Sequence, residues 1–537
     1  HTTAFLNDAV LLISDATHFL KKTGLSGCNP PASTHLRHSA ALQKLGSWSV
    51  IRPSTAKKER FFGVFFEVPK ATATTRAILN ARAQNARANR PPTFALAQFA
   101  LIVVMMCTFS EFYVADLRHW FYQIRLPAGT EQYFSVLCGS AIFEFLVLPM
   151  GFSWAPFIAQ CLCMGLFLLT RFAHSAIACT SPPPFVDFFQ KSTVVGRALC
   201  IYDNILVGTS SSTILEQLVA DIRGNAKRAN IIFKEEQVTR SPSFLGVVFT
   251  NSTDKVSWQH CAKNLERWSA RLEQPTSSNR DVAGLIGIIL WDANVHLRPL
   301  CLEQRCIQML RKVANDITCI SSWNHCSKLL PDEITLLRDR VRSITSLNIP
   351  STRLRAVLQT PIWLISDACR NDKYSGWGWL IVTNDRISRV EKGQFSTTMA
   401  LKPIFMLELW CALEAIRQIC LENSGVNLAI SISIDNQAAA HALRKGYSSV
   451  EEANEWMESA LSPFRDGSNT LIVLQIRSEE NPADGPSHNE KPQEDRLQAL
   501  LHARQKPQPF SAEDNDSCTS IPFRGGSDAS FDAQLWI

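Results

Sequence analysis

Several features that mark common classes of protein are missing from this sequence of 537 residues. Its 16 cysteines include no Cys-x-x-Cys pair, so we do not expect a zinc ribbon or knuckle. The apolar stretch 94–107 is too short for a membrane span and contains Gln98. The formal charge of +6 is small for a binder of nucleic acid. We expect reduced cysteines, no membrane partner and an intracellular protein, in the nucleus or the cytoplasm.

The apolar share of 46% is enough for packed cores, and the length suits several domains. Between residues 60 and 250, β-rich runs alternate with helical stretches, and residues 255–345 are mostly helical in pattern. Strands are expected at Phe61–Val68, Glu111–Leu117, Phe143–Pro149, Leu199–Val207 and Phe244–Phe249, and later near 376–383 and 428–434. A strong helix is expected at Met406–Glu422. The sequence opens with His1 and no Met, so we expect a fragment of a longer chain.

Two carboxylates stand in hydrophobic runs in the first half of the chain. Asp116 follows Phe-Tyr-Val-Ala, and Asp203 lies in Cys-Ile-Tyr-Asp-Asn-Ile-Leu-Val. A carboxylate in an apolar setting is costly unless a partner or cation neutralises it. Two such groups on one sheet would suit divalent cations and phosphoryl transfer. The alternative is a pair of hydrogen-bonded turn residues, and spacing alone does not decide between the two.

Four segments resemble the motifs of retroelement reverse transcriptases, in the same order. They are Asp-Leu-Arg-His-Trp-Phe-Tyr-Gln-Ile (116–124), the run from Phe143 to Pro156 that is similar to "YEFLVMPFGLTNAP", Tyr-Asp-Asn-Ile-Leu-Val (202–207), and Phe-Leu-Gly (244–246). The resemblance covers residues 60–345. It implies a right-hand polymerase with fingers, an antiparallel palm sheet and a helical thumb, in which Asp116 and Asp203 are catalytic metal ligands.

The resemblance also implies contacts with substrate. Phe121 would be the aromatic gate that excludes a 2′-hydroxyl by collision. Lys70 and Arg76 would hold the triphosphate, and Met150 and Gly151 would line the substrate site. The alternatives are an ordinary core aromatic for Phe121 and a solvated basic loop around Lys70.

One position departs from the resembled pattern. The family has a second Asp after Asp203, and this chain has Asn204. An amide adds no charge to a metal site, so Asn204 puts polymerase activity in doubt without excluding it.

A second group of acids follows in the last third of the chain. Asp367 ends an apolar run before Gly-Trp-Gly-Trp, Glu408 lies on the helix expected at Met406–Glu422, Asp435 precedes Asn436, and Asp484 lies in Asn-Pro-Ala-Asp-Gly-Pro-Ser-His. Taken alone, the alternative for each acid is a structural role as a helix cap, a turn residue or a solvated side chain. Together they resemble retroelement ribonuclease H, over residues 358–495. The resemblance implies that all four bind metal and act in catalysis, and that Asn436 contacts the 2′-hydroxyl of a hybrid. His488 stands where the family usually has Arg.

We therefore predict an α+β multidomain protein: an extension of unknown role (1–50), reverse transcriptase fingers and palm (51–250), a thumb and connection (251–355), an α/β ribonuclease H-like domain (356–500) and a flexible tail (501–537). The expected cofactor is Mg²⁺, two ions per active site, with Mn²⁺ as an alternative. The expected partners are an RNA template, a DNA primer, RNA–DNA hybrid, deoxynucleoside triphosphates and other proteins of the element.

The element most resembled is the tyrosine-recombinase type (DIRS, Ngaro and the VIPER elements of trypanosomatids), with gypsy-like and pararetroviral elements as competitors. The functional alternative is a decayed or domesticated copy that binds nucleic acid without polymerising. The charge distribution favours contact with nucleic acid, since residues 51–90 contain nine basic and two acidic residues, and the rest of the chain is nearly neutral.

Overall fold

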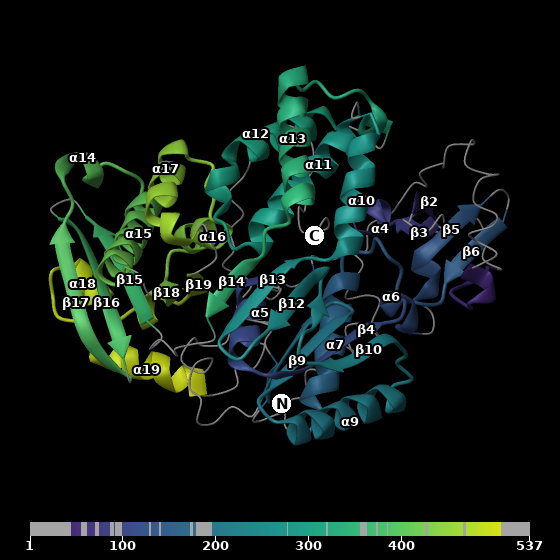
Figure 1. The fold of residues 1–537 in the computed structure, drawn as a ribbon, viewed down its shortest axis with the longest axis horizontal. Coiled ribbons are helices and arrows are strands. Elements are labelled where there is room, and N and C mark those ends of the chain that lie inside the picture. Colours follow the sequence, from purple (N-terminus) through teal and green to yellow (C-terminus); the bar gives the residue numbers. More distant parts are fainter. Residues whose placement is uncertain are drawn as a thin grey trace.

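A computed structural model describes most of the chain, in segments that carry the predicted sites. The described residues are 45–54, 62–69, 75–85, 88, 91, 99–127, 130–138, 141–171, 176–178, 196–275, 278–317, 321–354, 362–371, 374–383, 385–424, 428–464 and 469–505. Lys70, residues 1–44 of the predicted extension and residues 506–537 lie outside these segments. Figure 1 shows the fold, with the C-terminal elements at one side and the N-terminal strands at the other.

The first sheet has the order β1-β6-β5-β2-β3 and is formed from residues 51–145. Its strands are β1 (Ile51–Pro53), β2 (Phe62–Pro69), β3 (Thr75–Asn80), β5 (Ser135–Cys138) and β6 (Ala141–Phe145). Leu45 and Val50 are buried in the same core as Phe145, so the end of the predicted N-terminal extension is part of this unit.

The second sheet carries the first pair of predicted catalytic carboxylates. Its order is β10-β4-β9-β8-β7, with β4 (Glu111–Leu117) between β10 (Phe233–Thr239) and β9 (Asn204–Thr209). The pairs β10–β4, β4–β9 and β9–β8 are antiparallel, and β7 (Ala176–Ala178) runs parallel to β8 (Gly196–Ile201). Side chains alternate between two cores, as strand geometry requires. One core contains helices α7 (Ala155–Leu168) and α9 (Ser212–Arg228), and the other contains α5 (Phe99–Thr108).

A four-stranded sheet and a helical bundle follow. The sheet runs β11 (Ser243–Phe244), β12 (Val247–Asn251), β13 (Lys255–His260) and β14 (Ser351–Leu354). Between β13 and β14 lie α10 (Ala262–Glu273), α11 (Asn279–Val295), α12 (Gln304–Asp316) and α13 (Pro331–Leu347), which share a core around Ile286 and Leu337. A capping box of Ser278 and Asp281 fixes the start of α11. The expected helical region is confirmed here, with β13 and β14 framing it.

The last unit is a mixed sheet covered by helices. Its order is β17-β16-β15-β18-β19: the first three strands are antiparallel, and β15, β18 and β19 are parallel. The strands are β15 (Ile362–Arg370), β16 (Ser375–Thr383), β17 (Arg386–Gln394), β18 (Ala429–Ile434) and β19 (Thr470–Gln475). The helices are α14 (Thr397–Ala400), α15 (Ile404–Glu422), α16 (Gln437–Lys445), α17 (Glu451–Ala460), α18 (Asp484–Ser487) and α19 (Glu494–Gln505).

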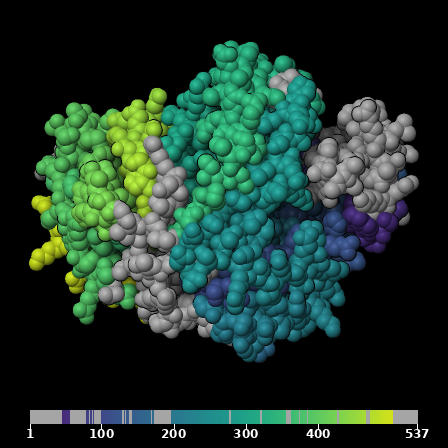
Figure 2. Space-filling view, viewed as in Figure 1, coloured from purple at the N-terminus to yellow at the C-terminus, as the bar shows by residue number. Residues whose placement is uncertain are grey.

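This last unit packs directly on the two before it. Ile472 and Leu474 of β19 share a buried core with Ile102 of α5. The guanidinium of Arg311, on α12, lies 5.3 Å from the centroid of the Tyr447 ring. Figure 2 shows the green and yellow C-terminal residues at one end of the molecule and the purple residues 45–54 at the other.

The predicted α+β multidomain fold is confirmed, with corrections to some of its parts. Leu199–Val207 is not one strand: Tyr202 has a φ of 55° and forms with Asp203 the turn of the β8–β9 hairpin. Phe244–Phe249 is likewise divided into β11 and β12 by a turn at Leu245 and Gly246, both with positive φ. Helix α19 continues through residues 501–505, where a flexible tail was expected, because Leu500 and Leu501 are buried. The predicted boundary at 250–251 falls inside β12.

Candidate active sites

Two neighbouring strands of the second sheet place the backbones of Asp116 and Asp203 close together. In the β4–β9 ladder, Asp116 pairs with Asn204, so their side chains project from the same face of the sheet. Asp203 is the preceding residue, in the hairpin turn, and its carbonyl accepts a hydrogen bond from the Leu117 amide at 2.9 Å. The Tyr202 amide donates to Gln160 Oε1 at 2.8 Å, and Gln160 Nε2 donates to the Cys200 carbonyl at 2.9 Å. The side chain of Gln160, on α7, therefore fixes the backbone at the β8–β9 turn.

Both carboxylates already have polar partners. Lys234 of β10 donates from Nζ to Asp116 Oδ2 at 2.5 Å, and Asn204 donates from Nδ2 to Asp203 Oδ1 at 2.9 Å. The side chain of Asp116 is 27% exposed and that of Lys234 is 52% exposed. The hydrogen bond to Asp116 raises the pKa of Lys234, so the ammonium stays charged. Sequence reasoning missed Lys234, which joins the site only through the β10–β4 register.

The other palm residues take separate positions. Phe121 lies on the short helix α6 (Trp120–Gln123), half-buried against the first core. Gly151 has a φ of 105°, and a Cβ there would stand 2.0 Å from the Leu79 carbonyl oxygen. Met150 accepts a hydrogen bond from the Leu79 amide at 3.1 Å, so Met150 and Gly151 lie against the end of β3. The backbone of Arg76 is in β3, and Lys70 is outside the described residues. Their contacts with substrate stay predictions.

Three of the four carboxylates in the last unit converge. Asp367 lies on β15, Glu408 on α15, and Asp435 follows β18. One ligand oxygen from each lies within 4.8 Å of the others. They meet because β15 pairs with β18 in parallel and α15 packs across β15. The arrangement places three hard oxygen donors at one point of the sheet.

Burial makes this cluster costly without a cation. Asp367 and Glu408 are each 5% exposed. Burial, followed by the charge of Asp435, raises the pKa of Asp367 to about 7. Burial and the charges of Asp367 and Asp435 raise the pKa of Glu408 as well. Among the described residues, the buried atoms Glu408 Oε2 and Asp435 Oδ1 have no hydrogen-bond partner. Two orphaned oxygens in an all-carboxylate site fit a hard divalent cation.

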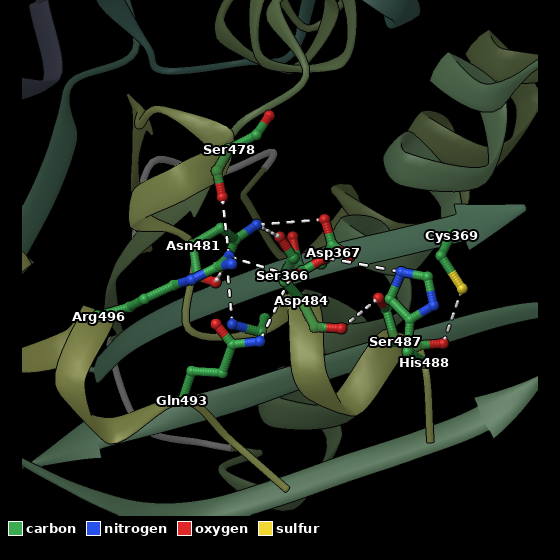
Figure 3. A network of polar contacts seen from close by, with 11 residues as sticks. Ser366, Asp367, Cys369, Ser478, Asn481, Asp484, Ser487, His488, Gln493 and Arg496 are labelled. Atoms are coloured by element: carbon green, nitrogen blue, oxygen red, sulfur yellow. Dashed lines mark hydrogen bonds and ion pairs between the residues drawn. The ribbon is translucent and has the colours of Figure 1, made fainter. Parts of the chain in front are cut away.

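The fourth carboxylate, Asp484, is turned toward other partners. Arg496 of α19 donates from Nη1 to Asp484 Oδ2 at 3.0 Å, and Gln493 Nε2 is 3.5 Å from the same oxygen. His488 Nε2 lies 3.7 Å from Asp484 Oδ1. Figure 3 shows these side chains around Asp484, with Asp367 beside them. No ligand atom of Asp484 belongs to the three-carboxylate group among the residues described.

Two asparagines have structural contacts at this site. Asn436 accepts from the Ala439 amide at 3.0 Å, so it caps α16, and contact with a hybrid stays a prediction. Asn481, which sequence reasoning did not single out, donates from Nδ2 to Asp367 Oδ1 at 3.2 Å and to the Ser366 carbonyl at 3.2 Å. It orients the Asp367 carboxylate from the buried side.

A second group with ligand spacing lies at the base of the helical bundle. His260 Nε2 is 2.9 Å and His296 Nε2 is 3.3 Å from Asp292 Oδ1, while Arg298 binds Asp292 Oδ2. Arg298 already supplies the positive charge that balances Asp292. A divalent cation would add uncompensated positive charge to a buried place, so we interpret the group as a hydrogen-bonded network.

Comparison with known proteins gives a partial likeness. No family model matches the chain. The chain is similar to the transposon Tf2-7 and Tf2-8 polyproteins of Schizosaccharomyces pombe, with 22% identity over 200 residues, or 37% of this chain. The matched part spans only 13% of the length of each polyprotein.

Two solved structures also match the chain over most of its length. They are foamy viral protease-reverse transcriptase with double-stranded DNA (13% identity, 86% of this chain and 87% of that one, TM-score 0.42) and with RNA/DNA hybrid (11%, 86% and 56%, TM-score 0.45). Both TM-scores are below 0.5, so a function for this chain rests on the positions of its own carboxylates.

No helix in the described part of the chain combines the length and apolarity that a bilayer crossing needs.

Proposed function

We propose that the chain is an RNA-directed DNA polymerase with ribonuclease H activity, from a retrotransposon. The observation that carries the proposal is the meeting of Asp367, Glu408 and Asp435, whose ligand oxygens lie within 4.8 Å of one another. The likeness to transposon polyproteins supports the retroelement origin. The tyrosine-recombinase type of element is a narrower proposal. It rests on the direct succession of the two catalytic units and on the sequence His-Leu-Arg-Pro-Leu at residues 296–300.

In the nuclease, Asp367, Glu408 and Asp435 would hold divalent cations, with Asp484 as a further ligand. Bound Mg²⁺ would supply activation of the attacking water and stabilisation of the leaving oxygen. Asn481 fixes the Asp367 carboxylate, and Asn436 stands at the first turn of α16, next to Asp435. RNA–DNA hybrid is the proposed substrate.

In the polymerase, Asp116 and Asp203 would hold the cations for addition of deoxynucleoside triphosphates to a DNA primer on an RNA template. The support is the β4–β9 ladder, which places Asp116 opposite Asn204 and next to the Asp203 turn. Phe121, Met150, Gly151, Lys70 and Arg76 keep their proposed contacts with substrate.

The nuclease is tested with the full chain, Mg²⁺ and an RNA–DNA hybrid labelled on the RNA strand. We expect cleavage by the wild type and its loss in Glu408→Gln. Glu414→Gln is the matched control, because Glu414 lies on the same helix but pairs with Arg417. Cleavage that survives Glu408→Gln, or no cleavage by the wild type, contradicts the proposal.

The second candidate function is a copy that binds nucleic acid without polymerising, and Asn204 favours it. Asn204 contributes an amide donor to Asp203 where a carboxylate would add charge for a metal. Primer extension by wild type and Asn204→Asp separates the two functions. Extension by the wild type supports the polymerase; extension by the variant alone shows a degenerate site.

A further inference from the structure

Arg496 links the edge of the nuclease site to the helix that closes the last unit. Its Nη1 donates to Asp484 Oδ2 at 3.0 Å, to the Ser478 carbonyl at 3.1 Å and to the Asn481 carbonyl at 3.2 Å. The same nitrogen, Nη1, therefore contacts the carboxylate and both carbonyls. Figure 3 shows Arg496 reaching from α19 between Ser478, Asn481 and Asp484.

The positive charge of Arg496 lies beside Asp484. Among the described residues, Asp484 is the only one of the four predicted carboxylates outside the converged group. Gln493 also donates to Asp484 Oδ2, at 3.5 Å, and His488 Nε2 lies 3.7 Å from Oδ1, beyond hydrogen-bond distance. By contrast, no described side chain forms an ion pair with Asp367, Glu408 or Asp435. Arg496 is close enough to Asp367 that its charge lowers the pKa of that carboxyl, against the larger effect of burial.

We propose that Arg496 substitutes for a cation at Asp484 in the metal-free protein, and that a divalent ion must compete with it for that carboxylate. The inference rests on the proposed nuclease function. A guanidinium held by two carbonyls within 3.2 Å cannot retreat far, so it repels an ion that approaches Asp484. Arg496 is thus a positioning residue that sets the cation concentration at which the Asp484 side of the centre fills.

The test measures binding of Mn²⁺ by electron paramagnetic resonance and calorimetry. The full chain carries Asp116→Asn and Asp203→Asn, so that the proposed polymerase site binds little Mn²⁺. Arg496→Gln removes the competing charge and the Nη1 donor. We expect the more weakly bound Mn²⁺ of this variant to bind roughly three- to tenfold more tightly than in the parent. The variant lacks both the unit charge and an ion pair whose side chains are 30% and 35% exposed.

Two matched variants isolate the contact. Lys392→Gln removes one positive charge from the same domain, but among the described residues Lys392 Nζ binds only the Asn489 and Glu490 carbonyls, at 2.9 and 3.2 Å. We expect its Mn²⁺ affinity to equal that of the parent. Arg496→Lys keeps the charge near Asp484, so it should restore most of the parent affinity.

The sign of the change separates this role from a purely structural one. If Arg496 only stabilised the fold, Arg496→Gln would bind Mn²⁺ more weakly or unchanged, and either result overturns the inference. An equal tightening in Lys392→Gln also overturns it, because charge alone would then explain the effect. If Glu408→Gln in the same background removes no bound Mn²⁺, the proposed function itself fails, whatever Arg496→Gln does.

Discussion

Lys234 and Asp116 form a close ion pair on adjacent strands, with Nζ 2.5 Å from Oδ2. The pair joins residues 118 positions apart, and it forms because β10 lies antiparallel to β4. It gives one of the two predicted polymerase carboxylates a positive partner before any cation binds.

Loss of this pair should change stability little. Its side chains are 52% and 27% exposed, so Lys234→Gln should alter the free energy of unfolding by less than about 1 kcal/mol. Urea unfolding of the full chain measures this, with Lys255→Gln as a control at another exposed strand position. A loss of several kcal/mol would show that Lys234 has a packing role that its exposure does not indicate.

The buried Asp292 should contribute far more. It contacts Arg298, His260 and His296 with only 5% of its side chain exposed. Asp292→Asn leaves Arg298 without its counter-charge, and we expect a loss of about 3–5 kcal/mol of unfolding free energy. Asp316→Asn, which breaks a pair with the 80% exposed Lys328, should cost less than about 1 kcal/mol. Equal effects in the two variants would contradict this interpretation of the network.

The raised pKa of Asp367 predicts that the folding stability of the metal-free protein depends on pH. Its pKa is raised from 3.8 to about 7, first by burial and then by Asp435. Between these values the folded state holds a proton that the unfolded chain has released, so this group favours folding at low pH and the benefit is lost as pH rises toward 7. With EDTA present, the stability of wild type minus that of Asp367→Asn should fall from pH 4 to pH 7. A constant difference would contradict the assignment.

Replacement of Glu408 should stabilise the metal-free protein and reduce its stabilisation by metal. Its buried carboxyl faces Asp367 and Asp435, and burial with these charges raises its pKa. Glu408→Gln should therefore raise the melting temperature in EDTA while reducing the increase that Mg²⁺ gives the wild type. Differential scanning calorimetry with and without Mg²⁺ measures both. An unchanged Mg²⁺ effect in Glu408→Gln would place the ion elsewhere.

The sequence was most informative where neighbours along the chain determine geometry. The strand Glu111–Leu117 has its predicted bounds. Asp367, Glu408 and Asp435 were grouped by the resemblance to ribonuclease H and not by periodicity, and the structure brings their carboxylates together. The β8–β9 turn was missed because Tyr202, a bulky aromatic, occupies a positive φ that normally signals Gly or Asn.

Contacts made only by tertiary structure could not be predicted. Lys234 and Arg496 stand in ordinary charged stretches, and each reaches a predicted carboxylate only once sheet register or helix docking is known. Asp484 was expected to join the other three carboxylates, and its pairing with Arg496 separates it from them in the described structure. Local pattern gives the identity of a ligand, whereas the charge that balances it comes from distant parts of the chain.

The most direct test of the account follows both activities in one reaction, with a labelled DNA primer and a differently labelled RNA template, in Mg²⁺. The wild type should extend the primer and cut the RNA of the hybrid. Asp116→Asn should lose extension but still cut a preformed hybrid, and Asp435→Asn should extend but not cut. If the wild type does neither, or if both variants retain both activities, the central claim of two separate carboxylate centres is wrong.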